Sequence, residues 1–154
     1  MLILCDGIQN GIIADKYGKR GTQFKGSMPT YSLGFRMQDI PSGTISFAFI
    51  LDDPDSVPVA GFKWIHWLGA NLCKEGIPDN ESINTLIFVQ GKNSWGQNLY
   101  GGMAPPNCPH TYVLRVFALD CLLNLKNGFT LEDLNREMSG HVLDSAFIEG
   151  IYSN

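Results

Sequence analysis

The sequence predicts a mainly β domain, a mostly antiparallel β-sandwich with one or two short helices. Glycine (17) and proline (8) are frequent, as in turn-rich β proteins. Several short segments alternate apolar and polar residues with a period of two, whereas helical periodicity with capping residues occurs once. A chain of 154 residues fits one core and not two, so residues 1–154 are expected to form a single domain.

The first half of the chain is predicted to form two main strands after an irregular start. Residues 6–30 are rich in Gly, Asp, Asn and Lys and predict irregular structure with one short strand. Residues 31–38 alternate strictly and predict a half-buried strand, and the Pro-Ser-Gly within residues 40–43 predicts a reversal. Residues 44–52 are apolar on one face and nearly uncharged on the other, which is typical of a central strand between two layers.

The second half continues the β pattern up to one helix. Residues 54–61 are expected to form a loop, residues 62–71 and 85–90 strands, residues 91–109 a long loop, and residues 113–119 a second buried strand.

Thr130 and Asp133 form a capping-box-like pair, and Gly140 suits the end of the helix that follows. Its apolar stripe consists of Leu131, Leu134 and Met138. Residues 145–153 predict a closing strand.

Charge and hydropathy exclude several classes of function. A formal net charge of −4 is the wrong sign for a nucleic-acid binder, which needs clustered Lys and Arg. No apolar run has the length of a spanning helix, so stable membrane insertion is not expected. Met1–Cys5 is too short for a secretion signal, and a cytoplasmic location is expected. The cysteines are scattered, which predicts reduced, mostly buried thiols, with Cys108 the most accessible: Cys5, Cys73, Cys108 and Cys121.

A glycine- and proline-rich loop is the strongest sign of a binding site. Residues 100–112 contain Gly101 and Gly102, three prolines, and then His110 and Tyr112 at the start of a strand. Residues two positions apart in a strand share a face, so the His110 and Tyr112 side chains are expected at one pocket rim. An ordinary long connection between strands is the alternative interpretation.

A second segment has a similar construction. Asp52, Asp53 and Asp55 surround Pro54, and these carboxylates either stand exposed in an Asx-type turn or include one that faces inward to orient an imidazole. His66 follows in an extended segment, where it is expected to share a face with Trp64 and Leu68. It is either a structural core histidine or part of a polar patch with His110.

We weighed three chemistries for such a patch. The long spacing between His66 and His110 disfavours a dedicated metal site, and no Gly-x-Ser-x-Gly elbow or marked oxyanion hole supports a hydrolase. An anion site fits better, because imidazoles, a tyrosine hydroxyl and the N–H groups of Gly101 and Gly102 could all donate to a phosphate. A nearby carboxylate could accept from an amine, so a zwitterion would satisfy both halves.

These segments resemble the two signature regions of the phosphatidylethanolamine-binding proteins, and most closely the prokaryotic Raf-kinase-inhibitor-like branch. The resemblance lies in Asp53-Pro-Asp55 with His66-Trp-Leu-Gly-Ala-Asn71, and in Tyr100-Gly-Gly, Pro105-Pro, His110-Thr-Tyr112 and Ala118-Leu-Asp120. Further familial stretches extend it over nearly the whole chain.

The resemblance implies a β-sandwich with Greek-key connections and a small anion pocket open at one end. Carried over by position, the ligand-binding residues are Asp53, Asp55, His66, Tyr100, Gly102, Pro106, His110 and Tyr112. Two departures bear on the pocket: Met103 follows Gly102 where the family usually has proline, and Asn107-Cys108-Pro109 replaces a glycine-containing stretch.

The expected function is therefore a non-enzymatic binding protein for small phosphate-bearing ligands such as phosphoethanolamine-type head groups, with no metal and no cofactor. The alternative is a protein-interaction module that inhibits a kinase or protease through the loops at the pocket rim, as eukaryotic relatives do. A hydrolase with His66 or His110 as general base is the third hypothesis. Prokaryotic relatives also make a homodimer an expected assembly.

Overall fold

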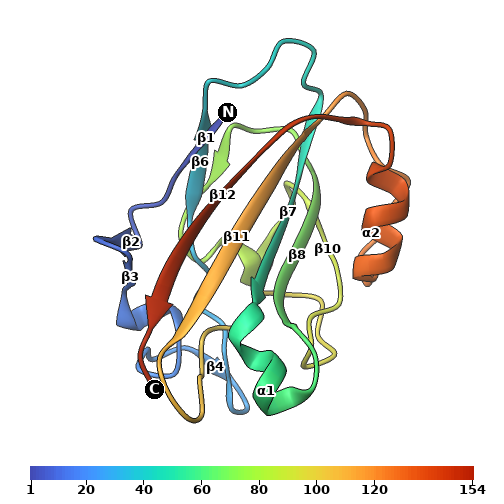
Figure 1. Ribbon diagram of the computed structural model, residues 1–154. Coiled ribbons are helices and arrows are strands. Elements are labelled where there is room, and N and C mark those ends of the chain that lie inside the picture. The colour runs from blue at the N-terminus through green and yellow to red at the C-terminus, as the bar shows by residue number, and fades with distance from the viewer.

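A computed structural model describes residues 1–154 and has a mainly β fold with few short helices (Figure 1). The larger sheet has the strand order β10 (Val89–Gln90), β8 (Trp64–Leu72), β7 (Ser46–Asp53), β11 (His110–Leu119), β12 (Val142–Tyr152), β3 (Ile12–Ile13) and β2 (Ile8–Gln9). The smaller sheet has the order β1 (Leu2–Leu4), β6 (Phe35–Gln38) and β9 (Gly76–Ile77). A separate pair joins β4 (Phe24–Lys25) to β5 (Met28–Pro29).

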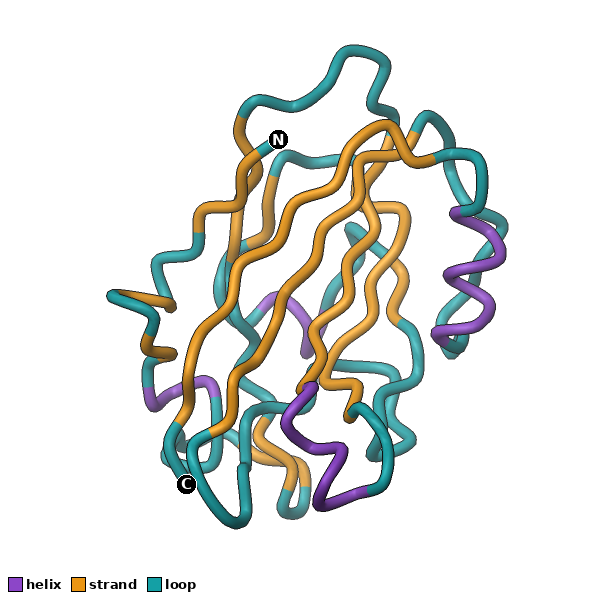
Figure 2. The backbone as a smooth tube through the Cα atoms, in the orientation of Figure 1, coloured by secondary structure: helices purple, strands orange, loops and turns teal.

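The helices are short and lie outside the sheets (Figure 2). They are α1 (Val57–Ala60), α2 (Leu131–Met138) and the 3-10 turns η1 (Asp15–Tyr17), η2 (Pro54–Ser56) and η3 (Glu81–Asn84). No helix is long and apolar enough to cross a membrane.

The order of the central strands is that of a Greek key. β7, β8 and β10 are neighbours, and β11 then returns to lie on the other side of β7, with the intervening β9 in the smaller sheet. Every pairing in the larger sheet is antiparallel except that of β12 with β3. The predicted sandwich is thus present, with a large curled sheet facing a small one.

The main core lies between the two sheets. Phe35 from the small sheet meets Phe49 from the large sheet edge-to-face at 5.2 Å between ring centroids, and Phe49 meets Trp67 at 4.7 Å. These rings belong to one cluster of buried side chains that includes Ile3 of β1 and Leu114 of β11. Such aromatic pairs add a modest orientational term to the burial of their large apolar area.

A second, smaller core lies on the opposite face of the large sheet, under α2. Ala48 and Ile50 of β7 pack there with Leu134 and Met138 of the helix. β7 is therefore buried on both faces, as predicted for a central strand. The capping box of α2 is also confirmed: Thr130 Oγ1 accepts from Asp133 N–H at 3.1 Å, and Asp133 Oδ2 accepts from Thr130 N–H at 3.0 Å.

One local prediction was wrong, and two predicted strands are shorter than expected. Residues 54–61 form η2 and α1 instead of a loop, because Pro54 suits a first helical turn and Gly61 ends it at φ 83°. Of residues 31–38, only β6 finds ladder partners, since the Gly34 N–H is taken by Asp79 Oδ1. Of residues 85–90, only β10 pairs with β8.

Two further predictions need correction. Residues 6–30 contain four two-residue strands, β2 to β5, instead of one. The cysteines are unpaired as predicted, but only Cys5 is buried, while Cys73 and Cys108 are exposed and Cys121 is half-buried.

Gly69 of β8 is predicted to tolerate no side chain. A Cβ at this position would stand 2.1 Å from the Phe49 ring, which lies across it in the facing strand. We expect Gly69→Ala to lower the free energy of unfolding by about 2 kcal/mol, measured by urea denaturation. In the double variant Gly69→Ala with Phe49→Leu, the change in the free energy of unfolding should differ clearly from the sum of the two single changes. A Gly69→Ala variant as stable as the wild type would contradict the packing.

Candidate functional site

A cavity of about 190 Å³ is lined in part by α1. Figure 1 shows α1 at the lower end of the large sheet. Its walls come from η2 and α1, the start of β8, the start of β11 and the long loop after β10. The lining residues are Asp53, Ser56, Val59, Ala60, Trp64, His66, Trp95, Ala104, Pro105, Pro106, His110 and Tyr112. The size suits a ligand of a few heavy atoms, below the range of drug-sized pockets.

A β-bulge in β8 aims His66 at this cavity. Leu51 pairs with Trp67 while the next residue of β7, Asp52, pairs with Ile65, so His66 is an extra residue opposite the bend. The bulge lets His66 and Trp67 both face the interior, where regular alternation would separate them. It also sends Leu68 to the opposite core under α2, so the prediction that His66 shares a face with Leu68 was wrong.

His66 is a neutral imidazole held by the neighbouring loop. Its Nδ1 lies 2.7 Å from the carbonyl oxygen of Gly101, so Nδ1 carries the proton and donates. Burial lowers its pKa to about 4. The Nε2 atom, which makes no hydrogen bond within the protein, therefore presents an acceptor and not a donor.

His110 and Asp53 form a buried pair on the opposite wall. His110 Nδ1 donates to Asp53 Oδ2 at 2.7 Å, and both side chains are almost fully buried. Burial raises the pKa of the Asp53 carboxyl, and the hydrogen bond from His110 opposes that rise. His110 Nε2 lies 2.9 Å from Asn107 Oδ1, so Asn107 occupies the second ring nitrogen of this histidine.

Two polar atoms at the cavity are buried without a partner. They are Asp53 Oδ1, an acceptor, and Trp64 Nε1, a donor. A buried polar group that makes no hydrogen bond costs about 1–3 kcal/mol. The hydroxyl of Tyr112 also makes no bond within the protein, and burial and then Asp53 raise its pKa, so it stays a donor.

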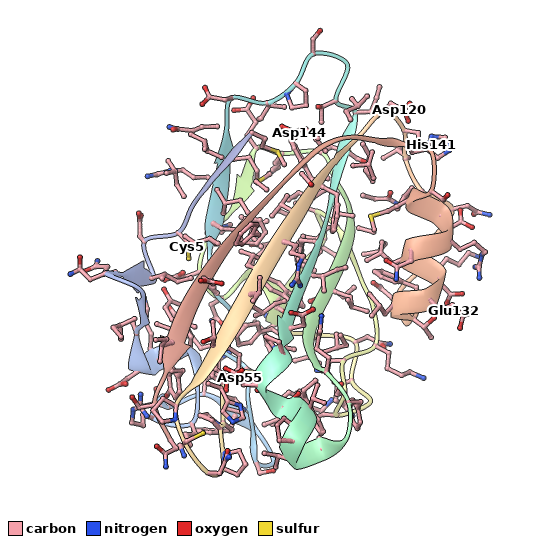
Figure 3. The ribbon with its side chains drawn as sticks, viewed as in Figure 1. Cys5, Asp55, Asp120, Glu132, His141 and Asp144 are labelled. Atoms are coloured by element: carbon pink, nitrogen blue, oxygen red, sulfur yellow. The ribbon has the colours of Figure 1, made fainter.

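The structure brings together five of the eight residues predicted for the site: Asp53, His66, Pro106, His110 and Tyr112 line the cavity. Asp55 does not, because its Oδ2 accepts from the Thr111 N–H at 2.8 Å and so ties η2 to β11. Figure 3 shows Asp55 at this end of the sheet.

Tyr100 and Gly102 support the cavity from behind. The hydroxyl of Tyr100 donates to the Tyr17 carbonyl at 2.7 Å, and the Gly102 N–H donates to the Pro29 carbonyl at 2.8 Å. The Gly101 N–H is also used, by the His66 carbonyl at 2.9 Å. The prediction that these two glycines offer N–H groups to an anion was therefore wrong, since both donors serve the fold.

The two departures from the family pattern have different consequences. Met103 is fully buried in the main core and does not line the cavity. Asn107 does affect the site, through its contact with His110.

Sequence reasoning missed the apolar part of the site. Trp64 and Trp95 meet edge-to-face at 5.1 Å, and Trp95 also meets the His66 ring at 5.3 Å. Val59 and Ala60 of α1 complete this wall. Trp64 lies near His66 in the sequence, and Trp95 lies near it in space. The presence of an aromatic residue in the sequence, however, does not tell whether its side chain lines a pocket or packs in a core.

Comparison with known proteins shows the family of the chain. The family model described as phosphatidylethanolamine-binding protein matches residues 6–153. The uncharacterised protein YxkA of Bacillus subtilis is 36% identical over 91% of this chain and 93% of its own length. A UPF0098 protein of Chlamydia muridarum is 40% identical over 74% of this chain and 77% of its own.

Two solved structures share the fold. A putative phosphatidylethanolamine-binding protein homolog of Chlamydia trachomatis superposes with a TM-score of 0.85 at 27% identity, over 99% of this chain and 97% of that one. YbcL of Escherichia coli, described as a new member of the mammalian family, superposes with a TM-score of 0.84 at 22% identity, over 99% and 98%.

The fold and the cavity thus define a mainly β protein of the binding type. The chain belongs to the phosphatidylethanolamine-binding protein family, and its similarity to the prokaryotic members agrees with the branch that the sequence predicted.

Burial of His66 predicts a specific pH dependence of stability. Its folded-state pKa of about 4 lies below the ordinary 6.5, so the unfolded chain binds a proton there first as the pH falls. Stability from this group is complete above pH 6.5 and is lost between 6.5 and 4, by on the order of 3 kcal/mol.

The measurement is urea unfolding of the wild type and of His66→Gln at pH 7.5 and 4.5. Carboxylates common to both proteins cancel in the difference, so the variant should lose less stability on acidification. Identical pH dependence in the two proteins would show that His66 is not buried as a neutral imidazole.

Proposed function

We propose that the protein is a non-enzymatic binding protein whose cavity takes a small phosphate-bearing ligand, best matched by a zwitterionic phosphoethanolamine-type head group. The observation that carries this proposal is the pair of unmatched buried atoms, Asp53 Oδ1 and Trp64 Nε1. One is an acceptor and the other a donor, so a ligand with both kinds of group satisfies both.

The ammonium half of such a ligand suits the acceptors. Asp53 Oδ1 offers a carboxylate oxygen, and His66 Nε2 offers a neutral lone pair. Aromatic faces also attract cations, and Trp64 and Trp95 stand on the same cavity wall.

The phosphate half suits the donors. Trp64 Nε1–H and the Tyr112 hydroxyl are available. Because the donors of Trp64 and Tyr112 are few and neutral, the cavity favours a singly charged phosphodiester or protonated phosphate over a dianion.

The surroundings of the candidate nucleophile favour binding over hydrolysis. Ser56 lines the cavity, but its Oγ lies 2.6 Å from the Asp53 carbonyl and 2.9 Å from the Phe62 carbonyl, and it accepts from the Trp64 N–H at 2.7 Å. A hydroxyl so engaged is not hydrogen-bonded to a histidine base, as nucleophilic catalysis requires. Homodimer assembly and a cytoplasmic location stay predictions from the sequence.

Calorimetric titration with phosphoethanolamine, inorganic phosphate and ethanolamine tests the proposal. We expect phosphoethanolamine to bind most tightly, and Asp53→Asn to weaken it by at least about tenfold while affecting phosphate less. Trp64→Phe, which keeps a ring and removes the N–H, should weaken both phosphate compounds.

Asp55→Asn is the matched control, since this carboxylate lies two residues away but outside the cavity. It should change the affinity only slightly. Phosphoethanolamine binding no tighter than its two halves, or unchanged in Asp53→Asn, would remove the proposal.

An apolar rim supports a second candidate, a module that inhibits a kinase or protease. Val57, Val59 and Phe62 are about half exposed on α1 and just after it, at 47%, 49% and 50%. Neighbouring exposed apolar side chains at a pocket mark a contact surface.

Inhibition assays against a panel of bacterial kinases and proteases test this second function. Inhibition that is lost when Val57, Val59 and Phe62 are all replaced by Ser, and retained in Asp53→Asn, would support it. Lack of inhibition across the panel, or inhibition unaffected by the triple change, would count against it.

A further inference from the structure

Three side chains with metal-ligating atoms converge at the end of β11 opposite the cavity. Asp120 and Cys121 follow this strand directly, and His141 precedes β12. One ligand atom of each lies within 4.8 Å of the others. Figure 3 shows Asp120 and His141 next to each other at the top of the sheet, far from Asp55.

Backbone hydrogen bonds hold the two segments together. The Asp120 N–H donates to the His141 carbonyl at 3.1 Å, which continues the pairing of Leu119 with Val142. The His141 N–H donates to the Met138 carbonyl at 3.0 Å, so the histidine is also fastened to the end of α2. The spacing of the three side chains is therefore set by the sheet and not by flexible loops.

The carbonyl of Cys121 is fixed as well. It accepts from the hydroxyl of Ser46, a fully buried residue of β7, at 2.5 Å.

The ligand atoms of His141 and Asp120 already face each other, and both side chains remain accessible. His141 Nδ1 lies 2.8 Å from Asp120 Oδ1, and the two side chains are 47% and 45% exposed. Nowhere else in the chain do three His, Cys, Asp or Glu side chains approach this closely.

We propose that Asp120, Cys121 and His141 form a zinc site. Thiolate, imidazole and carboxylate are the ligand types of Zn²⁺, and three protein ligands leave the fourth tetrahedral position to water. On binding, the imidazole carries its proton on Nε2, so that Nδ1 faces the ion, and the Cys121 thiol releases its proton to solvent. The Zn²⁺ takes the place of the hydrogen bond between His141 and Asp120.

The site is independent of the ligand cavity, because it lies at the other end of the same strand. A bound ion there would join the end of β11, the start of β12 and the end of α2. Since such binding favours the folded state only, Zn²⁺ would raise the thermal stability of the protein.

The experiment uses the full chain, reduced and freed of metal, with Co²⁺ as a spectroscopic probe and Zn²⁺ in calorimetry. Co²⁺ should produce a thiolate-to-metal charge-transfer band that Zn²⁺ in excess abolishes. Cys121→Ser should lose the band, whereas Cys73→Ser, which changes an exposed thiol elsewhere, should keep it.

Asp120→Asn and His141→Gln should each weaken Zn²⁺ binding by at least about tenfold. Thermal unfolding without metal checks that the variants fold, and Zn²⁺ should raise the melting temperature of the wild type but not of Cys121→Ser. A charge-transfer band that survives in Cys121→Ser, or Zn²⁺ affinity equal in wild type and all three variants, would overturn the proposal.

Discussion

The pairing of β11 with both of its neighbours is the constraint on which the rest of the structure depends. β11 is hydrogen-bonded along most of its length to β7 on one side and β12 on the other. The register that matches Val113 to Asp52 brings the start of β11 next to the end of β7, where His110 Nδ1 and Asp53 Oδ2 lie 2.7 Å apart. The same strand, at its other end, places Asp120 beside His141.

The cavity exists because this register is combined with a local exception. The bulge in β8 turns His66 inward without displacing Trp67 from the main core. A regular strand would have sent one of the two to the opposite face, since a shift of one residue reverses every side chain. The cavity thus forms where the sheet departs from its own period, which is common next to functional sites.

The polar groups behind the cavity wall and those inside the cavity differ in how fully their hydrogen bonds are satisfied. Behind it, Tyr100 and Gly102 have their hydrogen bonds satisfied within the protein, so they fix shape. Inside it, Asp53 and Trp64 each keep one buried atom without a partner. Proteins rarely leave buried groups unpaired, and the exceptions tend to lie at functional sites. Tyr100 and Gly102 therefore differ from Asp53 and Trp64, each of which has a hydrogen-bonding atom left unused by the fold.

Much of the fold could be predicted because it rests on local patterns. The double-sided burial of β7, the helix begun at Thr130 and the polar pair His110 and Tyr112 follow from periodicity and capping. The strand expected over residues 85–90 is confined to Val89–Gln90, because ladder formation needs a partner as well as β propensity. Likewise, the helical turns after Pro54 were hidden among residues that also favour loops.

The sequence by itself determined the class of fold, the family and five residues of the cavity, since these depend on residue type, spacing and motif. Only the tertiary structure decided which polar atoms remain free. The N–H groups of Gly101 and Gly102 donate to carbonyls that are distant in the sequence. Asn107 Oδ1 contacts His110 Nε2, and the Nε1 donor of Trp64 has no partner. The physical reason is that hydrogen-bond partners are chosen across the fold, among residues that the chain order does not bring together.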